Sequence, residues 1–545
     1  MFSADRHGHV PQYMLHYSKF KSGLPENQYK RLTLKTGAVI CELNPLHNGH
    51  ARLFRLMKEE HGCDFAVAVM SGNYVQRGAP AVMDKFTRAR AALLCGADLV
   101  IELPQLFSIC SAGEFAKAGV AAAIASGCDI LAFGAEHTDI LSPDGIYRGS
   151  AAGSEAERSA ATENAETAEA AGLTAGVNSA AVSAANDKAS AIQTVGFNAA
   201  DVSAANDKAS AVRTAGFNAA GVNAAVLHTP DNRIINGCPS KLSAGGLFTD
   251  YRKITASDAF STALRDFLKS GMNYPAARLE ALRHSGFSAE ACSFLSEPNN
   301  ILALEYIEAI SYFSHDSAPS IRPVMIDRSG DPFSAETPSD AAFTSASALR
   351  KQMLSDAAFS YAQYVPEAAA ALYAADDRRC FMDTDDFSGI LSHRLLSGKW
   401  RSEDFSSFYD VSPEIANRLA DIAELPLSFS ERAARLKTRQ YTYTRISRAL
   451  MHIALDISCE EAEAYKSDGF LRCLRVLGFR RDAAELLHAV KKNCSVPMVT
   501  KAADFKELLK NEIYRDNLYY AALAAKYGCA GEAALNEYTR QLVIV

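Results

Sequence analysis

The chain contains 545 residues, of which 48% are hydrophobic and 22% are charged, and this composition excludes a mini-protein, a collagen-like repeat and a disordered acidic chain. The length predicts roughly two to four domains. Acidic residues outnumber basic ones by 63 to 56, which disfavours a protein that coats nucleic acid or anionic membrane over its whole surface.

Residues 1–36 are polar and contain no continuous apolar segment, so we expect a flexible extension and no signal peptide. No later segment is long and apolar enough to predict a membrane-spanning helix. The twelve cysteines are scattered without a Cys-x-x-Cys pair, which indicates neither a zinc site nor a disulfide framework. We therefore expect a cytoplasmic protein without a membrane partner.

Short apolar runs at residues 37–43, 64–72, 97–104 and 128–136 alternate with segments whose apolar residues recur every three or four positions. The runs are typical of strands buried on both faces, and the segments between them are typical of helices packed on a sheet. This order predicts an α/β fold with a Rossmann-like, doubly wound parallel sheet. A fifth run, at residues 323–328, is expected to join the same sheet.

Residues 142–247 interrupt this order with an Ala-rich segment of low complexity. The sequence VSAANDKASA begins at Val182 and again at Val202, which gives a period of 20 residues. Because the repeats contain almost no large apolar residues, they cannot bury a shared core, and we interpret them as a surface insertion. A folded functional module is the alternative. The catalytic domain would comprise residues 37–360 without this insertion.

Residues 361–545 show the apolar spacing of helices, and we expect a separate α-helical domain without buried strands. Its most basic stretch, residues 431–450, carries six cations against one acid and includes two tyrosines. This composition suits contacts to RNA phosphates and unpaired bases, although a solvated helix face is the alternative. The candidate RNA-binding residues are Arg435, Lys437, Arg439, Arg445 and Arg448.

The segment after the first predicted strand, CELNPLHNGHARLF, contains His47, Gly49 and His50 at the start of a predicted helix. A helix N-terminus offers unpaired N–H groups and a positive dipole to a phosphate, and a glycine allows close approach. Imidazole donors stabilise the charge that develops on an α-phosphate under in-line attack. Two incidental histidines at a surface turn are the alternative. We interpret His47 and His50 as catalytic.

Two further sites are candidates for phosphate contact. The segment TSASALRKQM contains Ser345 and Arg350 near a predicted helix start. A serine is an ordinary N-cap there, but cations in a first turn are unfavourable unless an anion lies nearby. Lys85 is the other candidate, with a structural role as the alternative. No constellation of carboxylates predicts a metal site.

The segments ELNPLHNGH, GADLVIELP, FGAE, EPNNILALEYIEAI, SASALRK and LRVLGF occur in this order, and together they resemble the bacterial tRNA(Met) cytidine acetate ligase family. That family belongs to the H-x-G-H nucleotidyltransferase superfamily. The resemblance covers residues 36–140 and 260–545. It implies that acetate attacks the α-phosphorus of ATP to give acetyl-adenylate and pyrophosphate. The acetyl group then passes to N4 of the wobble cytidine of elongator tRNA(Met), and Mg²⁺ is expected to accompany ATP.

The resemblance also implies an ATP site at the carboxyl edge of the sheet, where ligands bind in open α/β folds. Asn299 would hold the adenine or ribose, and Arg328 would neutralise phosphates. The complete implied set is Ile40, Cys41, Glu42, Leu43, Asn44, Pro45, Leu46, His47, Asn48, Gly49, His50, Ala51, Arg52, Leu53, Gly134, Asn299, Arg328 and Ser329.

The sequence departs from the family pattern at Leu43, Leu46, Phe86 and Ala135, none of which removes a group that the chemistry needs. Two other functions stay open. A nucleotidyltransferase acting on a small phosphorylated metabolite would not need the basic helical domain. A non-catalytic ATP- or RNA-binding protein would keep the pocket for regulation. No DNA partner is expected, and the sequence predicts neither the oligomeric state nor the choice of acyl group.

Overall fold

The computed structural model describes residues 34–136, 146–147, 244–314, 321–327, 343–355, 359–375, 381–528 and 537–545. The predicted extension comprises residues 1–36, and residues 1–33 of it lie outside the described ranges. Strand β1 begins at Thr36. The predicted insertion also lies outside them, apart from strand β7 (Ile146–Tyr147) and the first residues of helix α8 (Ala244–Thr255).

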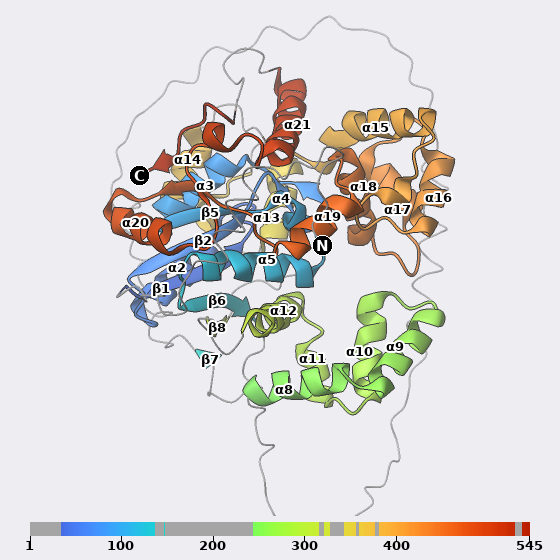
Figure 1. Cartoon of the computed structure of the whole chain (residues 1–545), viewed down its shortest axis with the longest axis horizontal. Coiled ribbons are helices and arrows are strands. Elements are labelled where there is room, and N and C mark those ends of the chain that lie inside the picture. The colour runs from blue at the N-terminus through green and yellow to red at the C-terminus, as the bar shows by residue number, and fades with distance from the viewer. Residues whose placement is uncertain are drawn as a thin grey trace, which may run out of the picture. The chain divides into compact units, whose positions relative to one another are not determined.

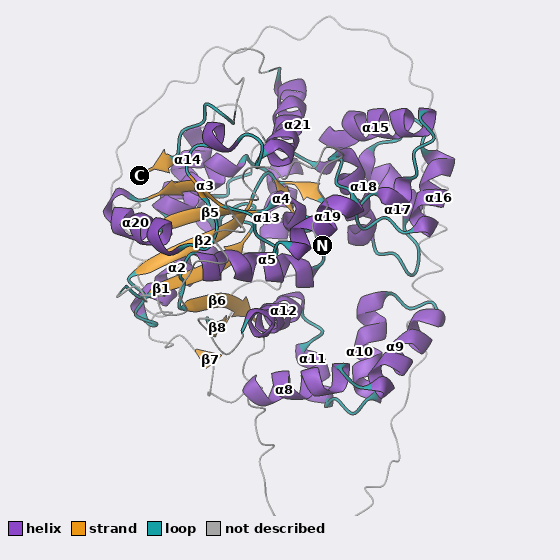
Figure 2. Ribbon diagram, viewed as in Figure 1, coloured by secondary structure: helices purple, strands orange, loops and turns teal. Residues whose placement is uncertain are grey.

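A nine-stranded sheet is the centre of the described chain, with the strand order β10-β9-β5-β2-β1-β6-β8-β7 and with β11 paired to β9. Figures 1 and 2 show β5, β2, β1, β6 and β8 following one another across this sheet. The core strands pair in parallel, and each predicted apolar run forms one of them. The predicted doubly wound parallel sheet is therefore confirmed. These strands are β1 (Thr36–Cys41), β2 (Phe65–Ser71), β5 (Leu99–Leu103), β6 (Ile130–Ala135) and β8 (Arg322–Asp327).

The central strands are continuously apolar because their side chains alternate between two buried cores. Ala38 and Ile40 of β1 enter one core, and Val39 and Cys41 enter the other. Helices α5 (Ala112–Ala125) and α12 (Pro298–Phe313) supply residues to the first core. Helices α2 (Asn48–Glu59), α3 (Lys85–Leu94), α13 (Ala346–Ser355) and α14 (Glu367–Ala375) supply residues to the second. The sheet is thus covered on both faces, as buried parallel strands require.

The expectation of a C-terminal region without buried strands is wrong. Strand β9 (Leu474–Phe479) lies antiparallel to β5, and β10 (Met498–Val499) and β11 (Val543–Ile544) pair with β9. The apolar run of β9 is interrupted by Arg475, whose guanidinium is buried beside Glu102 and Glu537. The last part of the chain therefore completes the nine-stranded sheet.

Helices dominate the rest of the described chain, in agreement with the sequence. Between the insertion and α12 lie α8, α9 (Asp258–Lys269), α10 (Tyr274–His284) and α11 (Ala289–Phe294). Before β9 lie α15 (Ser388–Trp400), α16 (Pro413–Ile422), α17 (Phe429–Leu436), α18 (Tyr443–Ala454) and α19 (Cys459–Ser467). Further elements, besides short 3-10 helices, are β3 (Tyr74–Val75), β4 (Ala79–Pro80), α4 (Gln105–Ser108), α20 (Ala484–Asn493) and α21 (Lys510–Tyr527).

The order of the strands predicts a ligand-binding crevice beside β1. The chain runs from β1 to β2 and β5 on one side, and β6 and β8 add on the other side. The winding direction therefore reverses between β1 and β6, and loops that leave their carboxyl ends diverge there. The loop after β1 carries the His47 motif, so the topology brings this motif to the expected binding edge.

Candidate functional site

The His47 motif forms the N-terminus of helix α2. His47 is the N-cap residue with extended backbone, and its Nδ1 atom accepts a hydrogen bond of 3.1 Å from the backbone N–H of Gly49. The backbone N–H of His47 in turn donates to Nδ1 of His50 over 3.3 Å. The two side chains therefore form a reciprocal capping box, a role usually filled by Ser or Thr with Glu.

This capping arrangement fixes the hydrogen positions of both imidazoles. Because each Nδ1 atom accepts a hydrogen bond, the neutral rings of His47 and His50 carry their hydrogen on Nε2. The ring centroids are 3.9 Å apart, so the two Nε2 donors lie together at one helix N-terminus. A Cβ atom at Gly49 would lie 2.9 Å from Cε1 of His47, which explains why glycine stands between them. Donors in this position suit an anionic phosphate.

Arg88 on α3 holds the loop that precedes the motif. Its fully buried guanidinium donates to the backbone carbonyls of Glu42, Ser71 and Gly72, at the carboxyl ends of β1 and β2. The carboxylate of Glu42 accepts a 2.8 Å hydrogen bond from the backbone N–H of Gln76. Sequence analysis missed Arg88 because a lone arginine in an amphipathic helix gives no sign that it is buried.

Arg350 reaches the same loop from the second predicted motif. Its guanidinium donates to the backbone carbonyl of Asn44, and burial lowers its pKa to about 10. Ser345 is buried and accepts a 3.1 Å hydrogen bond from the N–H of Ala348, as an N-cap does. The structure thus brings Arg350 to the His47 loop and gives Ser345 a structural bond.

The ends of β6 and β8 supply the opposite side of the crevice. Gly134 lies on β6, and the side-chain amide of Asn299 donates to Oε1 of Glu136 just beyond this strand over 2.9 Å. Asn300, which sequence analysis missed, is fully buried and bonds both the N–H and the carbonyl of Glu136. Arg328 and Ser329, the remaining predicted residues here, lie outside the described residues.

The remaining predicted ATP-site residues lie along β1, its loop and α2. Ile40 and Cys41 are buried at the end of β1, and Leu43, Asn44 and Leu46 are buried in the loop, where the Asn44–Pro45 peptide is cis. Ala51, Arg52 and Leu53 are half-buried on α2. Arg52 donates to the carbonyl of Asp327 over 2.8 Å, which ties α2 to the end of β8.

Lys85 has a different environment from the one predicted for a phosphate ligand. Its ammonium is fully buried and pairs with Glu102 at 3.1 Å, with Glu537 at 3.5 Å and with Asp516. Arg475 joins the same three carboxylates. We call these five side chains the buried ion cluster. It joins α3, β5, β9, α21 and the segment before β11.

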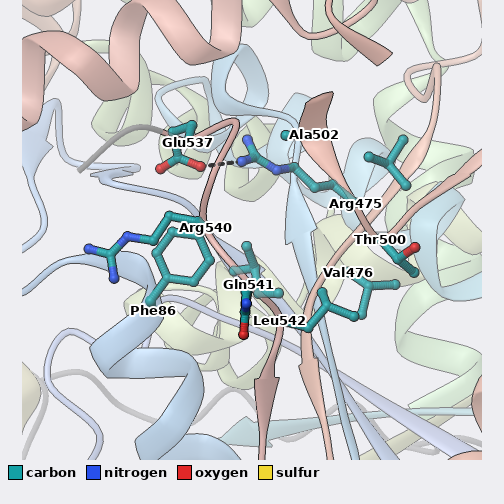
Figure 3. A pocket seen from close by; sticks show the side chains of 11 residues that line it. Phe86, Arg475, Val476, Thr500, Ala502, Glu537, Arg540, Gln541 and Leu542 are labelled. Atoms are coloured by element: carbon teal, nitrogen blue, oxygen red, sulfur yellow. Dashed lines mark hydrogen bonds and ion pairs between the residues drawn. The ribbon is translucent and has the colours of Figure 1, made fainter. Parts of the chain in front are cut away.

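A small pocket lies beside the buried ion cluster. Figure 3 shows the paired Arg475 and Glu537 in its wall, together with Phe86 and Arg540. The cavity volume is about 20 Å³, which is room for little more than one water molecule. This pocket is too small for a nucleotide, and the loops around His47 are the better candidate for the ATP site.

The five predicted RNA-binding residues fall into two groups. Arg445 and Arg448 of α18 both pair with Asp410, and the pair to Arg448 measures 3.2 Å. Arg435, Lys437 and Arg439, at the end of α17 and in the following loop, are exposed. The second group is therefore better placed to contact a polyanion.

Two other predictions concern metals and membranes. Within the described ranges, no group of three or more His, Cys, Asp or Glu side chains is arranged to hold a metal ion. In the same part of the chain, no helix combines the length and the hydrophobicity needed to cross a membrane.

A sequence profile described as HIGH Nucleotidyl Transferase matches residues 34–191 and 246–532. The chain belongs to this family. The family description spells His-Ile-Gly-His, and this chain has Asn48 at the second position. The side-chain amide of Asn48 donates to the carbonyl of Gln363 over 3.0 Å, which joins the motif to the segment before α14.

Relatives within this family cover nearly the whole chain. The tRNA(Met) cytidine acetate ligase of Acetivibrio thermocellus is 26% identical over 530 residues, which cover 94% of this chain and 100% of the relative. The ligase of the same name from Syntrophotalea carbinolica is 28% identical over 479 residues, which cover 88% and 87% of the two chains. The resemblance inferred from the sequence is therefore confirmed.

Two solved structures have a similar fold. Crystal structures of Thermotoga maritima TmcAL, bound with alpha-thio ATP and without ligand, superpose with TM-scores of 0.65 and 0.66 at 21% sequence identity. Each match covers 94% of this chain, and 99% and 100% of the respective other chain. The fold is therefore shared over nearly the whole length of the chain.

Proposed function

We propose that this protein is an ATP-dependent tRNA(Met) cytidine acetate ligase. The observation that carries the proposal is the His47–His50 pair, which places two Nε2 donors at the N-terminus of α2 beside the β1–β6 crevice. This arrangement suits a nucleotide α-phosphate. The acetate and tRNA substrates follow from the relatives of that name, which match this chain over nearly its whole length.

The reaction divides into two balanced steps. A carboxylate oxygen of acetate attacks the α-phosphorus of ATP, a P–O bond forms, and pyrophosphate leaves with the electrons of the broken bond. His47 and His50 donate from Nε2 to the α-phosphate oxygens, where negative charge develops. The N4 amine of the wobble cytidine of elongator tRNA(Met) then attacks the acetyl carbon, AMP leaves, and the amine loses a proton.

We propose that Mg²⁺ accompanies ATP. The described residues contain no metal-ligating cluster, and we assign no step of the reaction to a protein-bound metal. A divalent cation held by the phosphates would neutralise the leaving pyrophosphate. We also propose that the protein acts in the cytoplasm. The nine cysteines in the described ranges are all free, as is usual in reducing compartments.

The proposal is tested with purified protein, ATP, Mg²⁺, radiolabelled acetate and unmodified elongator tRNA(Met). We expect acetyl-AMP without RNA and acetylcytidine with RNA, and both should fall sharply in His50→Ala. If neither product forms, the ligase is excluded, and a screen of small phosphorylated metabolites with ATP and CTP tests the nucleotidyltransferase alternative. If the protein forms no product but binds RNA, and if His47→Ala leaves this RNA binding unchanged, the non-catalytic alternative is favoured.

Because β9 belongs to the central sheet, a truncation of the C-terminal region does not test RNA binding alone. Removing all residues after 360 would delete β9 from the catalytic sheet, so loss of activity in that truncation would say nothing about RNA. The insertion is a better target for deletion. We propose that residues 148–243 are dispensable, and a short linker in their place should leave acetyl-AMP formation and RNA acetylation unchanged. Loss of either activity with an intact fold would contradict this.

A further inference from the structure

The backbone of Leu43 is strained at the point where β1 leads into the His47 loop. Its φ angle is +48°, in the left-handed region that residues other than glycine rarely adopt, and its side chain is fully buried. A conformation of this kind persists only where the surrounding structure holds it, and such conformations are concentrated at functional sites. The groups that hold the turn at Leu43 are therefore candidates for a functional role.

The residue before Leu43 is held at two points. The carbonyl of Glu42 accepts a 2.6 Å hydrogen bond from Nη1 of Arg88 on α3. The carboxylate of Glu42 accepts a hydrogen bond of 2.8 Å from the backbone N–H of Gln76, in the turn between β3 and β4. Helix α3 and this turn therefore fix both the main chain and the side chain of Glu42.

The residue after Leu43 is also held at two points. The carbonyl of Asn44 accepts a hydrogen bond from the guanidinium of Arg350 on α13. The side-chain Oδ1 atom of Asn44 accepts a hydrogen bond of 2.7 Å from the backbone N–H of Val82, which follows β4. Both neighbours of Leu43 are thus fixed by groups from other elements, as a strained backbone requires.

Only three residues separate the turn at Leu43 from His47. The ring of Pro45 fixes its φ angle, and the side chain of Leu46 is fully buried. This short segment has little freedom to absorb a shift of the turn before the helix begins. The position of Leu43 therefore determines where His47, and with it His50, presents the Nε2 donor.

Arg88 makes the largest number of hydrogen bonds among the groups that hold this turn. In addition to Glu42, its guanidinium donates to the carbonyl of Ser71 over 3.1 Å, to that of Gly72 and to that of Met83 over 2.9 Å. Arg88 is fully buried and burial lowers its pKa, yet it pairs with no carboxylate among the described residues. Because a guanidinium holds its donors in one rigid plane, Arg88 fixes the ends of β1 and β2 relative to each other.

Arg432 offers a comparison within the same chain. In the part of the chain that the structure describes, the other buried cations are Lys85, Arg475 and Arg515, which pair with carboxylates, and Arg432, which does not. The guanidinium of Arg432 donates to carbonyls at and after the end of α16 and to a serine of α15. Arg432 therefore matches Arg88 in burial and in bonding, but it joins helices outside the sheet.

We infer that Arg88 is a positioning residue for the adenylation step, because it holds the Leu43 turn that directs His47 and His50 toward the α-phosphate. Its side chain is fully buried, so it acts through the loop and not on the substrate. The inference rests on the proposed function and deepens it. The two histidines act on charge that develops during the attack, so misplacing them lowers the rate far more than the affinity for ATP.

The experiment measures kcat and the KM for ATP in acetate-dependent ATP–pyrophosphate exchange without RNA, with the full chain. The variants are Arg88→Lys, His47→Asn and their double substitution, and Arg432→Lys is the matched control. Lysine keeps the positive charge but cannot reach four carbonyls at once. Urea unfolding of every variant identifies the protein that is folded under the conditions of the assay.

In Arg88→Lys, kcat should fall by about 10- to 10²-fold, whereas the KM for ATP should change by less than about threefold. The double substitution should lose far less than the product of the two single losses, because a misplaced histidine and a missing one disable the same interaction. Arg432→Lys should lower the unfolding midpoint but leave kcat and KM unchanged.

A normal kcat in folded Arg88→Lys, or losses that multiply in the double substitution, would overturn the inference while the proposed function stands. If Arg88→Lys does not fold, Gln76→Pro replaces it. Gln76 is the second residue of a tight turn, where proline is favoured, and this substitution removes only the N–H that holds the Glu42 carboxylate. A lower kcat with unchanged KM would then support the inference, and a normal kcat would overturn it. If the unaltered protein shows no acetate-dependent exchange, the proposed function itself is wrong.

Discussion

The backbone N–H of Gly49 donates to Nδ1 of His47 over 3.1 Å, so the first histidine of the motif also caps helix α2. One imidazole therefore closes the helix N-terminus with Nδ1 and keeps its hydrogen on Nε2. The two roles can be separated, because asparagine is among the best N-cap residues but has no donor in the position of Nε2.

His47→Ala should lose both roles. We expect the free energy of unfolding to fall by about 1 kcal/mol from loss of the cap. We expect acetate-dependent ATP–pyrophosphate exchange to fall by about 10² to 10³, the usual effect of removing one donor to a developing anion. His47→Asn should recover the stability but not the exchange. Near-normal exchange in His47→Asn would mean that the imidazole serves only as a cap.

Lys85→Met tests the buried ion cluster. The substitution leaves Glu102, Asp516 and Glu537 with Arg475 alone, and breaking a buried charge network of this kind costs about 3 to 5 kcal/mol. We expect a lower midpoint of urea unfolding, with unchanged ATP affinity in the protein that remains folded. A normal unfolding midpoint together with weaker ATP binding would instead support the phosphate contact predicted from sequence.

Gly78→Ala tests the packing of the β3–β4 hairpin on α18. Gly78 has φ +74°, and an added Cβ atom would lie 2.4 Å from the backbone nitrogen of Arg448. Gly62 also has a left-handed backbone (φ +62°), but its nearest contact would be 3.8 Å away. We expect Gly62→Ala to cost about 1 kcal/mol and Gly78→Ala roughly 3 kcal/mol, measured by urea unfolding. Equal costs would show that the hairpin moves freely from α18.

His452 predicts a pH dependence of stability. It is fully buried on α18, its Nδ1 lies 2.8 Å from the carbonyl of Tyr409, and burial lowers its pKa to about 4. The unfolded chain binds a proton near pH 6.5 and the folded chain does not, so stability falls as the pH drops from about 6.5 to 4. The loss reaches about 3 kcal/mol. In His452→Gln, this part of the pH profile should disappear from thermal unfolding curves, and an unchanged profile would assign it to other groups.

The sequence predicted the parallel strands well because apolar residues dominate each run. It missed β9, whose second residue is Arg475, and a buried charge there is acceptable only beside Glu102 and Glu537. Glu102 is far away in the sequence and its partnership cannot be read locally. A strand that can be buried only because other elements supply partners for its charge therefore has the sequence pattern of a surface segment.

The candidate site shows the same limit. The position of His47 and His50 at a helix start was predictable because a strand, a short loop and a helix start are all local features. The role of Lys85 was not, because its partner Asp516 is more than 400 positions away. Arg445 and Arg448 looked like RNA ligands in a basic stretch, yet Asp410 from another loop pairs with both. Motifs made of neighbouring residues can be read from sequence, whereas pairings between distant charges cannot.

The antiparallel pairing of β5 with β9 also has a consequence for biosynthesis. About 370 residues separate these strands, so during translation β5 emerges from the ribosome long before its neighbour exists. Its open edge is apolar and could recruit strands from other nascent chains. We therefore expect newly made protein to depend on chaperones until β9 docks, and expression at lower temperature to favour soluble product.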